Sequence, residues 1–457
     1  MASTGKLENN RSGAWLLVLF FLLGLACLVC PEAAESGVAT AWVRSYNEGN
    51  KDWTAGLALD RQGNVYVSGT SQRPVEKPNG FVFNYHFATI KYSHNGRRLW
   101  VRRHNSPGSK INVANALAVD GAGNVYIAGN SNNNDYHLLK YDTHGNLLWE
   151  SNPGVNGQPS ALSIDSRGNV YVFGQATLNN SLVYSTIKYS PKGRKLWVKK
   201  YKSPGSWGTI AKSMAVDRQG NVYVTGYSYY IDGQSEQYAY ATLKYDTHGT
   251  LLWESLQSIV GEPVAVAVDG QGNVYVTGGV EFVISGNSAF ITIKYNADGK
   301  FLWKSRYMPG IGSYYPVAMA IDDLGNVYIT GGAQYRTISD YFTIKYDTNG
   351  TLLWQSSYIG GGPMAMTLDG QGNVYVSGWA WSDLGFVGID FTTIKYNSHG
   401  EEIWVQRYNS PTYNDSIPVA IAADSQDNVY ATGFMGVDDS SGDYVTIRYI
   451  QSPRIER

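Results

Sequence analysis

The chain has 457 residues and a balanced charge, with 36 Lys and Arg against 37 Asp and Glu. This balance argues against a nucleic-acid-binding protein, which usually carries a basic excess, and 13% aromatic residues argue against disorder. Two cysteines cannot form a disulfide framework. The 51 glycines and the low charged fraction of 16% indicate many tight turns and strands.

The N-terminal segment has the order of a secretory signal. Met1–Arg11 carries two basic side chains against one acidic one, and the 17 residues of Ala14–Cys30 carry no charge. We expect residues 1–36 to be a signal peptide or, if uncleaved, a membrane anchor, since 17 apolar residues just reach the length of a span. Lipidation at Cys27 is a further alternative. Export to the periplasm, the cell surface or the exterior is expected in each case.

Eight copies of one pattern fill the rest of the chain. The first element is D-x-x-G-N-V-Y. Its asparagines run from Asn64 to Asn428, a span of 364 residues in seven steps, so the mean repeat length is 52 residues. This period is close to that of propeller blades. The second element is T-I-K-Y or a close variant. The third is a tryptophan, present as Trp42, Trp100, Trp149, Trp197, Trp253, Trp303, Trp354 and Trp404.

Each repeat contains four short strand-like runs, which we name A to D in chain order. In one repeat they are Val264–Val268, Asn273–Gly278, Phe290–Tyr295 and Phe301–Tyr307. They are rich in β-branched and aromatic residues and are bounded by Gly, Asn and Asp. The A–B and C–D turns begin with Asp, Asn or Ser and carry Gly at the fourth position, as type I turns favour. No ten-residue apolar stripe of helical period occurs, so essentially no helix is expected.

The ends of the repeat region predict how the fold closes. Thr40–Tyr46 is a D strand with no C strand before it, and Tyr444–Ile450 is a C strand with no D strand after it. If the first strand completes the last blade, no sheet edge stays open. The sequence therefore predicts an all-β, eight-bladed β-propeller of four-stranded blades, formed by residues 40–451 as a single domain.

The repeat resembles a known family. The pattern AVAVD-x-x-GNVYVTG, followed by F-x-TIKY and G-x-x-LW, is similar to the bacterial SBBP β-propeller repeat and recurs over Thr40–Tyr449. The resemblance implies a propeller fold and an exported or cell-surface location, without implying a reaction. The family is named for seven-bladed propellers, whereas this chain carries eight copies.

Aromatic residues outside the repeat positions are the candidate binding residues. The A–B and C–D turns should share one face, and the B–C and D–A connections, which vary in length, the other. We call the second one the variable face, and expect function there because loops on a rigid scaffold carry function. Aromatic rings among Ser, Asn and Gly suit a sugar ring or a protein surface; the alternative is that they fold back over the blade ends. The candidates are Trp53, Trp207, Tyr229, Tyr230, Tyr314, Tyr315, Trp379 and Trp381.

The repeated charged residues are interpreted as structural. The T-I-K-Y lysines should pack between blades against a repeated aspartate or an aromatic face, and the repeated aspartates should cap turns rather than hold calcium. The seven histidines show no metal-ligand spacing, and His86, His104 and His137 are scattered along the chain. No catalytic motif is present. We therefore expect no catalytic residues, no metal and no cofactor.

The function predicted from these patterns is a non-enzymatic, monomeric binding module. Its partner would be a protein or glycan of the cell envelope or exterior, with no nucleic acid, and with membrane contact only through an uncleaved N-terminal segment. Two alternatives stay open. One is a propeller hydrolase, lyase or quinoprotein-like enzyme acting at the channel mouth, although the set of residues that binds PQQ and calcium in quinoproteins is not matched. The other is a scaffold or adhesion protein without a discrete pocket.

Overall fold

The structure is a computed structural model, and it describes residues 37–48, 51–78, 80–106, 108–132, 135–232, 235–282, 287–335, 338–382, 388–410, 415–438 and 441–451. Within these ranges the chain is all-β, with strands β1 to β32 and no α-helix. None of the described residues belongs to a helix that could cross a membrane. The predicted signal or anchor, residues 1–36, lies outside the described ranges.

The strands fall into sets that occupy the same place in successive antiparallel groups of four. The A strands are β2 (Lys51–Leu59), β6 (Asn112–Val119), β10 (Gly157–Ile164), β14 (Gly208–Val216), β18 (Pro263–Val268), β22 (Ser313–Ile321), β26 (Gly361–Leu368) and β30 (Asp415–Ala423). The B strands are β3 (Val65–Lys77), β7 (Val125–Ser131), β11 (Val170–Leu178), β15 (Val222–Asp232), β19 (Val274–Phe282), β23 (Val327–Tyr335), β27 (Val374–Trp381) and β31 (Val429–Asp438).

The outer half of each group is built in the same way. The C strands are β4 (Gly80–Tyr92), β8 (Asp135–Tyr141), β12 (Ser181–Tyr189), β16 (Ser235–Tyr245), β20 (Asn287–Tyr295), β24 (Ile338–Tyr346), β28 (Ile389–Tyr396) and β32 (Ser441–Gln451). The D strands are β5 (Arg98–His104), β9 (Leu147–Ser151), β13 (Lys195–Tyr201), β17 (Leu251–Ser258), β21 (Phe301–Tyr307), β25 (Leu352–Ile359), β29 (Glu402–Tyr408) and, from the start of the chain, β1 (Val38–Tyr46).

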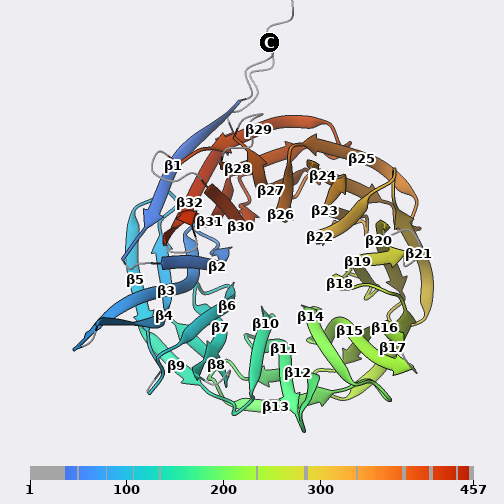
Figure 1. Cartoon of the computed structure of the whole chain (residues 1–457), viewed down its shortest axis with the longest axis horizontal. Coiled ribbons are helices and arrows are strands. Elements are labelled where there is room, and N and C mark those ends of the chain that lie inside the picture. Colours follow the sequence, from blue (N-terminus) through green and yellow to red (C-terminus); the bar gives the residue numbers. More distant parts are fainter. Residues whose placement is uncertain are drawn as a thin grey trace, which may run out of the picture.

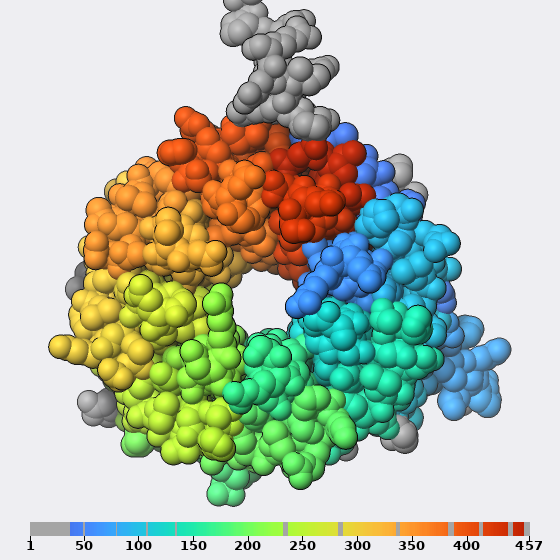
Figure 2. Space-filling view, turned by 180° about the vertical axis from the view of Figure 1, so that it is seen from behind, coloured from blue at the N-terminus to red at the C-terminus, as the bar shows by residue number. Residues whose placement is uncertain are grey.

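The groups are arranged around a central opening. Figure 1 shows the A strands nearest the opening and the D strands on the outside. Seen from behind, the opening is not filled by side chains (Figure 2). Strand β1 pairs antiparallel with β32, with Tyr46 opposite Tyr444, and β2 lies against β30, β31 and β32. The first and last parts of the described chain are thus neighbours.

The D-x-x-G-N-V-Y signature is a self-contained hydrogen-bonded turn. In the fifth copy, Asp269 Oδ1 accepts the backbone N–H groups of Gln271 and Asn273, each at 2.9 Å. Its Oδ2 accepts Asn273 Nδ2 at 2.8 Å and the Tyr275 hydroxyl at 3.0 Å. Gly272 takes the left-handed conformation, with φ 83°. This network accounts for the constant spacing within the repeat and confirms that the aspartates cap turns.

The repeat tryptophan joins each group to the next. Trp100 Nε1 donates to Thr143 O at 3.0 Å, in the second position of the next C–D turn. A Cβ on Gly145 of that turn would lie 3.0 Å from the Trp100 ring, so glycine allows the ring to approach. Equivalent bonds of 2.9–3.2 Å are made by Trp42, Trp149, Trp197, Trp253, Trp303 and Trp354.

Trp404 is the exception. In the last group the outer strand β1 comes from the other end of the chain, so no C–D turn joins it to β32. Trp404 is 4% exposed, and its Nε1 has no hydrogen-bond acceptor in the part of the chain that the structure describes.

The T-I-K-Y lysines are structural, as predicted. Lys91 Nζ lies 4.8 Å from the centre of the Tyr66 ring and 3.7 Å from Asp60 Oδ2, and it donates to Thr143 O at 3.2 Å. Burial lowers the pKa of Lys91. The same arrangement of a cation over a tyrosine ring recurs at Lys140, Lys188, Lys244, Lys294, Lys345, Lys395 and Arg448.

The hydrophobic core consists of separate clusters between neighbouring groups. One cluster, for example, contains Tyr275 from β19, Tyr307 from β21 and Val327 from β23. Each group therefore buries its faces against its neighbours, and the core lies between the sheets.

Candidate functional site

The variable face contains fewer irregular loops than the sequence suggested. The B–C connection of the first group, expected as a loop, is a hairpin, because β3 and β4 pair without interruption up to Lys77 and Gly80. Strands β15 and β16 likewise pair up to Asp232 and Ser235. The B and C strands of these two groups are therefore longer than runs such as Asn273–Gly278 and Phe290–Tyr295 led us to expect.

The structure spreads the predicted binding aromatics over four groups. Trp207 is 61% exposed and Tyr315 is 40% exposed. Tyr229 and Tyr230 are half-buried, and the Tyr229 ring packs over Gly208, where an added Cβ would lie 2.4 Å from the Tyr229 hydroxyl. This ring folds back onto its own group.

Tyr314 is a correction to the predicted set. Its side chain is 0% exposed and stands edge-on to Phe342 and Phe290, with ring centres 5.5 and 6.4 Å away. It belongs to the core because, in the alternation of β22, it points into the sheet interface while Tyr315 points outward. We leave Tyr314 out of the binding set.

Two tryptophans of the predicted set meet on β27. The rings of Trp379 and Trp381 are 5.4 Å apart at 82°, and both side chains are half-buried. Trp379 O accepts the Tyr341 hydroxyl at 3.0 Å. The Tyr341 bond ties the β27 backbone at this pair to the neighbouring group.

Trp53 lines a pocket of about 780 Å³ at the junction of the first and last groups, which we call the seam pocket. Trp53 and Tyr85 form an aromatic pair there, with ring centres 5.8 Å apart at 60°. The lining residues come from β2, β4, β30, β31 and β32: Lys51, Asp52, Trp53, Thr54, Tyr85, Asp415, Ile417, Phe434, Gly436 and Gly442.

Carboxylates give the seam pocket its polarity. Asp52 is 1% exposed; its Oδ2 accepts the Glu48 N–H at 3.1 Å, and its Oδ1 has no hydrogen-bond partner among the described residues. Burial raises the pKa of Asp52, and the Asp443 carboxylate adds to this effect. Asp415 lies on the lining of the same pocket. Asp52 is therefore buried behind the pocket wall, and the half-buried Asp415 is the carboxylate that a ligand beside the aromatic wall could reach.

Other hollows belong to the repeat. A pocket of about 870 Å³ between two groups is lined by Lys345, Trp354 and Asp369, all repeat residues. Another pocket, of about 850 Å³, lies at a different junction and is lined by Lys91 and Trp100, which occupy the same repeat positions as Lys345 and Trp354. Because scaffold residues form these hollows, they give no reason to assign a ligand. The seam pocket is lined mainly by residues that the repeat does not require.

The sequence missed several of these residues. Asp52 and Asp415 stand at the start of two A strands, and Ile417 and Phe434 look like ordinary strand residues. Tyr85 lies outside the repeat positions but was not among the candidate binding residues. An alignment of the repeats would place Asp52 and Asp415 at the variable-face ends of β2 and β30. This placement is the sequence feature that could have identified them as pocket residues.

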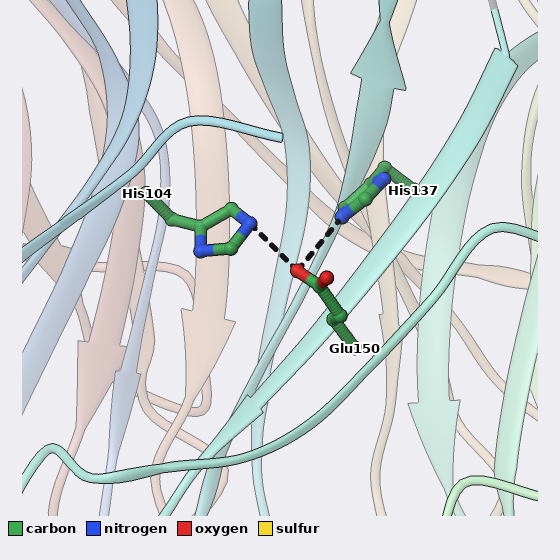
Figure 3. A group of neighbouring side chains, drawn as sticks. All are labelled: His104, His137 and Glu150. Carbon is green, nitrogen blue, oxygen red and sulfur yellow. Dashed lines mark ion pairs between the residues drawn. The ribbon is translucent and has the colours of Figure 1, made fainter. Parts of the chain in front are cut away.

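The prediction that the histidines are scattered is wrong for two of them. His104 on β5 and His137 on β8 lie beside Glu150 on β9, with one ligand atom from each residue within 4.8 Å of the others (Figure 3). The cluster lies on C and D strands, away from the A strands that border the central opening. The sequence did not reveal the cluster, because His104 comes from a different group than His137 and Glu150, which lie on the paired strands β8 and β9.

Comparison with known proteins supports the repeat assignment. The family model described as SBBP, beta-propeller repeat, matches residues 42–73, 99–137 and 205–229. The predicted resemblance is confirmed at these three segments. No curated protein matches the sequence.

Solved structures with a similar fold have diverse functions. A eukaryotic initiation factor is 12% identical, with 78% of each chain covered and a TM-score of 0.44. Virginiamycin B lyase from Staphylococcus aureus is 12% identical, with 73% of this chain and 94% of that chain covered and a TM-score of 0.40. An ulvan lyase is 11% identical, with 71% and 90% covered and a TM-score of 0.43. At these values the likenesses carry no functional argument.

Proposed function

We propose that this SBBP-repeat chain is an exported, non-enzymatic binding module that takes a glycan in the seam pocket. The observation that carries the proposal is the pairing of an aromatic wall, Trp53 and Tyr85, with the carboxylate of Asp415 in one hollow, behind which Asp52 is buried. The charged segment and apolar run of residues 1–36 support export.

We also infer that the ring has eight blades and is closed by β1. Eight A strands, the pairing of β1 with β32 and the contacts of β2 with the last group support this inference. In this arrangement the seam pocket lies where the two ends of the chain meet. Its lining therefore differs from that of every internal junction.

The chemistry of the pocket suits a sugar. Aromatic side chains offer large flat contact areas with little entropy to lose, and carboxylate oxygens accept hydrogen bonds from hydroxyl groups. The volume of about 780 Å³ falls within the range of roughly 300–1,000 Å³ that is usual for small-ligand sites. A protein partner that inserts a polar loop is the alternative occupant.

The test compares two tryptophan variants of the full chain. A panel of cell-wall oligosaccharides is titrated against the wild type, Trp53→Ala and the control Trp207→Ala, which removes an exposed tryptophan outside the pocket. We expect Trp53→Ala to weaken binding by about 10-fold or more, and Trp207→Ala to have little effect. Equal affinity of Trp53→Ala and wild type, or no binding of any glycan, would contradict the assignment.

One observation favours an enzyme as the second candidate. Asp52 is a buried carboxyl group with a raised pKa on the wall of a pocket, which is a common setting for a general acid or base. Incubation with the same oligosaccharides distinguishes the two functions. Cleavage products that disappear with Asp52→Asn would indicate catalysis, whereas binding without turnover supports the binding module.

A further inference from the structure

We infer that His104, His137 and Glu150 form a binding site for a divalent transition-metal ion, for which zinc is the best match. The site joins the group β2–β5 to the group β6–β9. It is separate from the seam pocket, and the inference does not depend on the proposed function.

The three side chains converge from different strands. His104 Nε2 lies 2.8 Å from Glu150 Oε2, and His137 Nε2 lies 3.7 Å from the same oxygen. Figure 3 shows both rings turning a nitrogen toward the carboxylate. A tetrahedral zinc ion with bonds of about 2.0–2.1 Å sets its ligand atoms roughly 3.3 Å apart. The widest separation, within 4.8 Å, would have to shorten by roughly 1.5 Å, which rotation of the side chains can supply.

The surroundings hold both imidazoles in place. The Phe87 ring stacks against His104, with ring centres 6.4 Å apart at 29°, and against His137, with centres 5.9 Å apart at 27°. Ser106 Oγ lies 3.2 Å from His137 Nε2. These contacts restrict the two imidazoles before an ion arrives, so less entropy is lost on binding, while small rotations still allow the nitrogen atoms to approach each other.

Two nitrogen atoms of the cluster lack a well-formed hydrogen bond. His137 is 5% exposed, and its Nδ1 has no hydrogen-bond partner among the described residues. His104 Nε2 makes no well-aligned hydrogen bond in the described part of the chain, although it is close to Glu150. Buried polar atoms are normally paired. A cation bonded to His104 Nε2 and to the carboxylate would give that nitrogen a partner. At His137 the ion would replace the Ser106 hydroxyl beside Nε2 and would leave Nδ1 unchanged.

The donor set selects the kind of ion. Two imidazoles and one carboxylate are a zinc ligand set, in which a water molecule occupies the fourth position. Calcium and magnesium prefer oxygen ligands, and the site offers no thiolate for softer ions. The Glu150 side chain is 38% exposed, so solvent reaches the open side.

The experiment measures zinc binding to the full chain without a histidine tag, after removal of metal with a chelator. We expect calorimetry to show one equivalent of bound zinc in the wild type. Loss of one ligand in His137→Gln or Glu150→Gln should weaken zinc affinity by about 100-fold or more, which is at least the effect of losing a supporting residue. His248→Gln is the matched control, because the His248 side chain is 84% exposed in a turn, and it should bind like the wild type.

A second readout separates a ligand role from loss of fold. Cobalt(II) should give visible absorption bands of a low-coordinate site in the wild type, but not in Glu150→Gln, whose circular dichroism should be unchanged because residue 150 is partly exposed. Zinc should also raise the thermal unfolding midpoint of the wild type only. The inference is overturned if the wild type binds no zinc, if the ligand variants bind it with wild-type affinity, or if His248→Gln weakens binding equally.

Discussion

Trp404, whose indole N–H has no hydrogen-bond acceptor among the described residues, allows a matched test of how the groups are joined. Trp100→Phe and Trp404→Phe remove the same atoms from equivalent positions, both of which are buried, at 9% and 4% exposure. Trp100 loses the bond to Thr143 O. Trp404 has no such bond to lose. Ring packing is lost in both variants, and phenylalanine keeps an aromatic face for Arg102, whose guanidinium lies 5.7 Å from the Trp100 ring centre, so the difference between the variants reports mainly the hydrogen bond.

The magnitude follows from the partners on each side. A neutral hydrogen bond contributes about 1 kcal/mol net. Thr143 O keeps the bond from Lys91 at 3.2 Å, so no orphaned carbonyl adds to the cost at Trp100. At Trp404 the substitution removes an unpaired buried N–H, whose burial itself costs about 1–3 kcal/mol. We expect Trp100→Phe to be more destabilising than Trp404→Phe by at least about 1 kcal/mol.

Guanidinium unfolding followed by far-UV circular dichroism measures this difference, since fluorescence would be altered by the substitutions themselves. The slopes of the transitions must agree for the free energies to be compared. Equal destabilisation, or a larger loss for Trp404→Phe, would refute the idea that the indole N–H bond joins neighbouring groups.

Three further outcomes test the scaffold and the seam pocket. Gly278→Ala places a Cβ 2.3 Å from Glu262 O, whereas the Cβ of Gly279→Ala meets nothing within 4 Å. In chemical denaturation, Gly278→Ala should lower the free energy of unfolding by about 3 kcal/mol and Gly279→Ala by less than about 0.5 kcal/mol. Asp269→Ala removes the acceptor of four hydrogen bonds and should cost about 2–3 kcal/mol, and an unchanged denaturation midpoint would contradict the capping role. Because burial raises the pKa of Asp52 in the folded state, its contribution to stability is present at low pH and is lost as pH rises through that pKa. Asp52→Asn should therefore be more stable than the wild type at neutral pH, with the difference disappearing below about pH 4, and a less stable variant at neutral pH would show that the charge is favourable there.

The sequence by itself determined the repeating architecture. In a turn such as Asp269–Tyr275 the Asp269 carboxylate accepts all four of its hydrogen bonds from within seven residues, so the spacing of Asp, Gly, Asn and Tyr is enough to predict it. The position of the tryptophan and lysine in each repeat follows from the same period, because every junction repeats the same contact. These features follow from the order of the residues alone, since each depends on local geometry copied eight times.

The candidate sites depend on contacts that the period does not encode. His137 and Glu150 lie on the paired strands β8 and β9, but His104 meets them only because the end of β5 packs against the next group. Trp53 and Phe434 share a pocket because the two ends of the chain meet. Tyr314 and Tyr315 are adjacent in sequence, yet the pleat buries one ring and exposes the other. In each case the deciding quantity is the relative placement of two sheets, which packing fixes and which no single repeat contains.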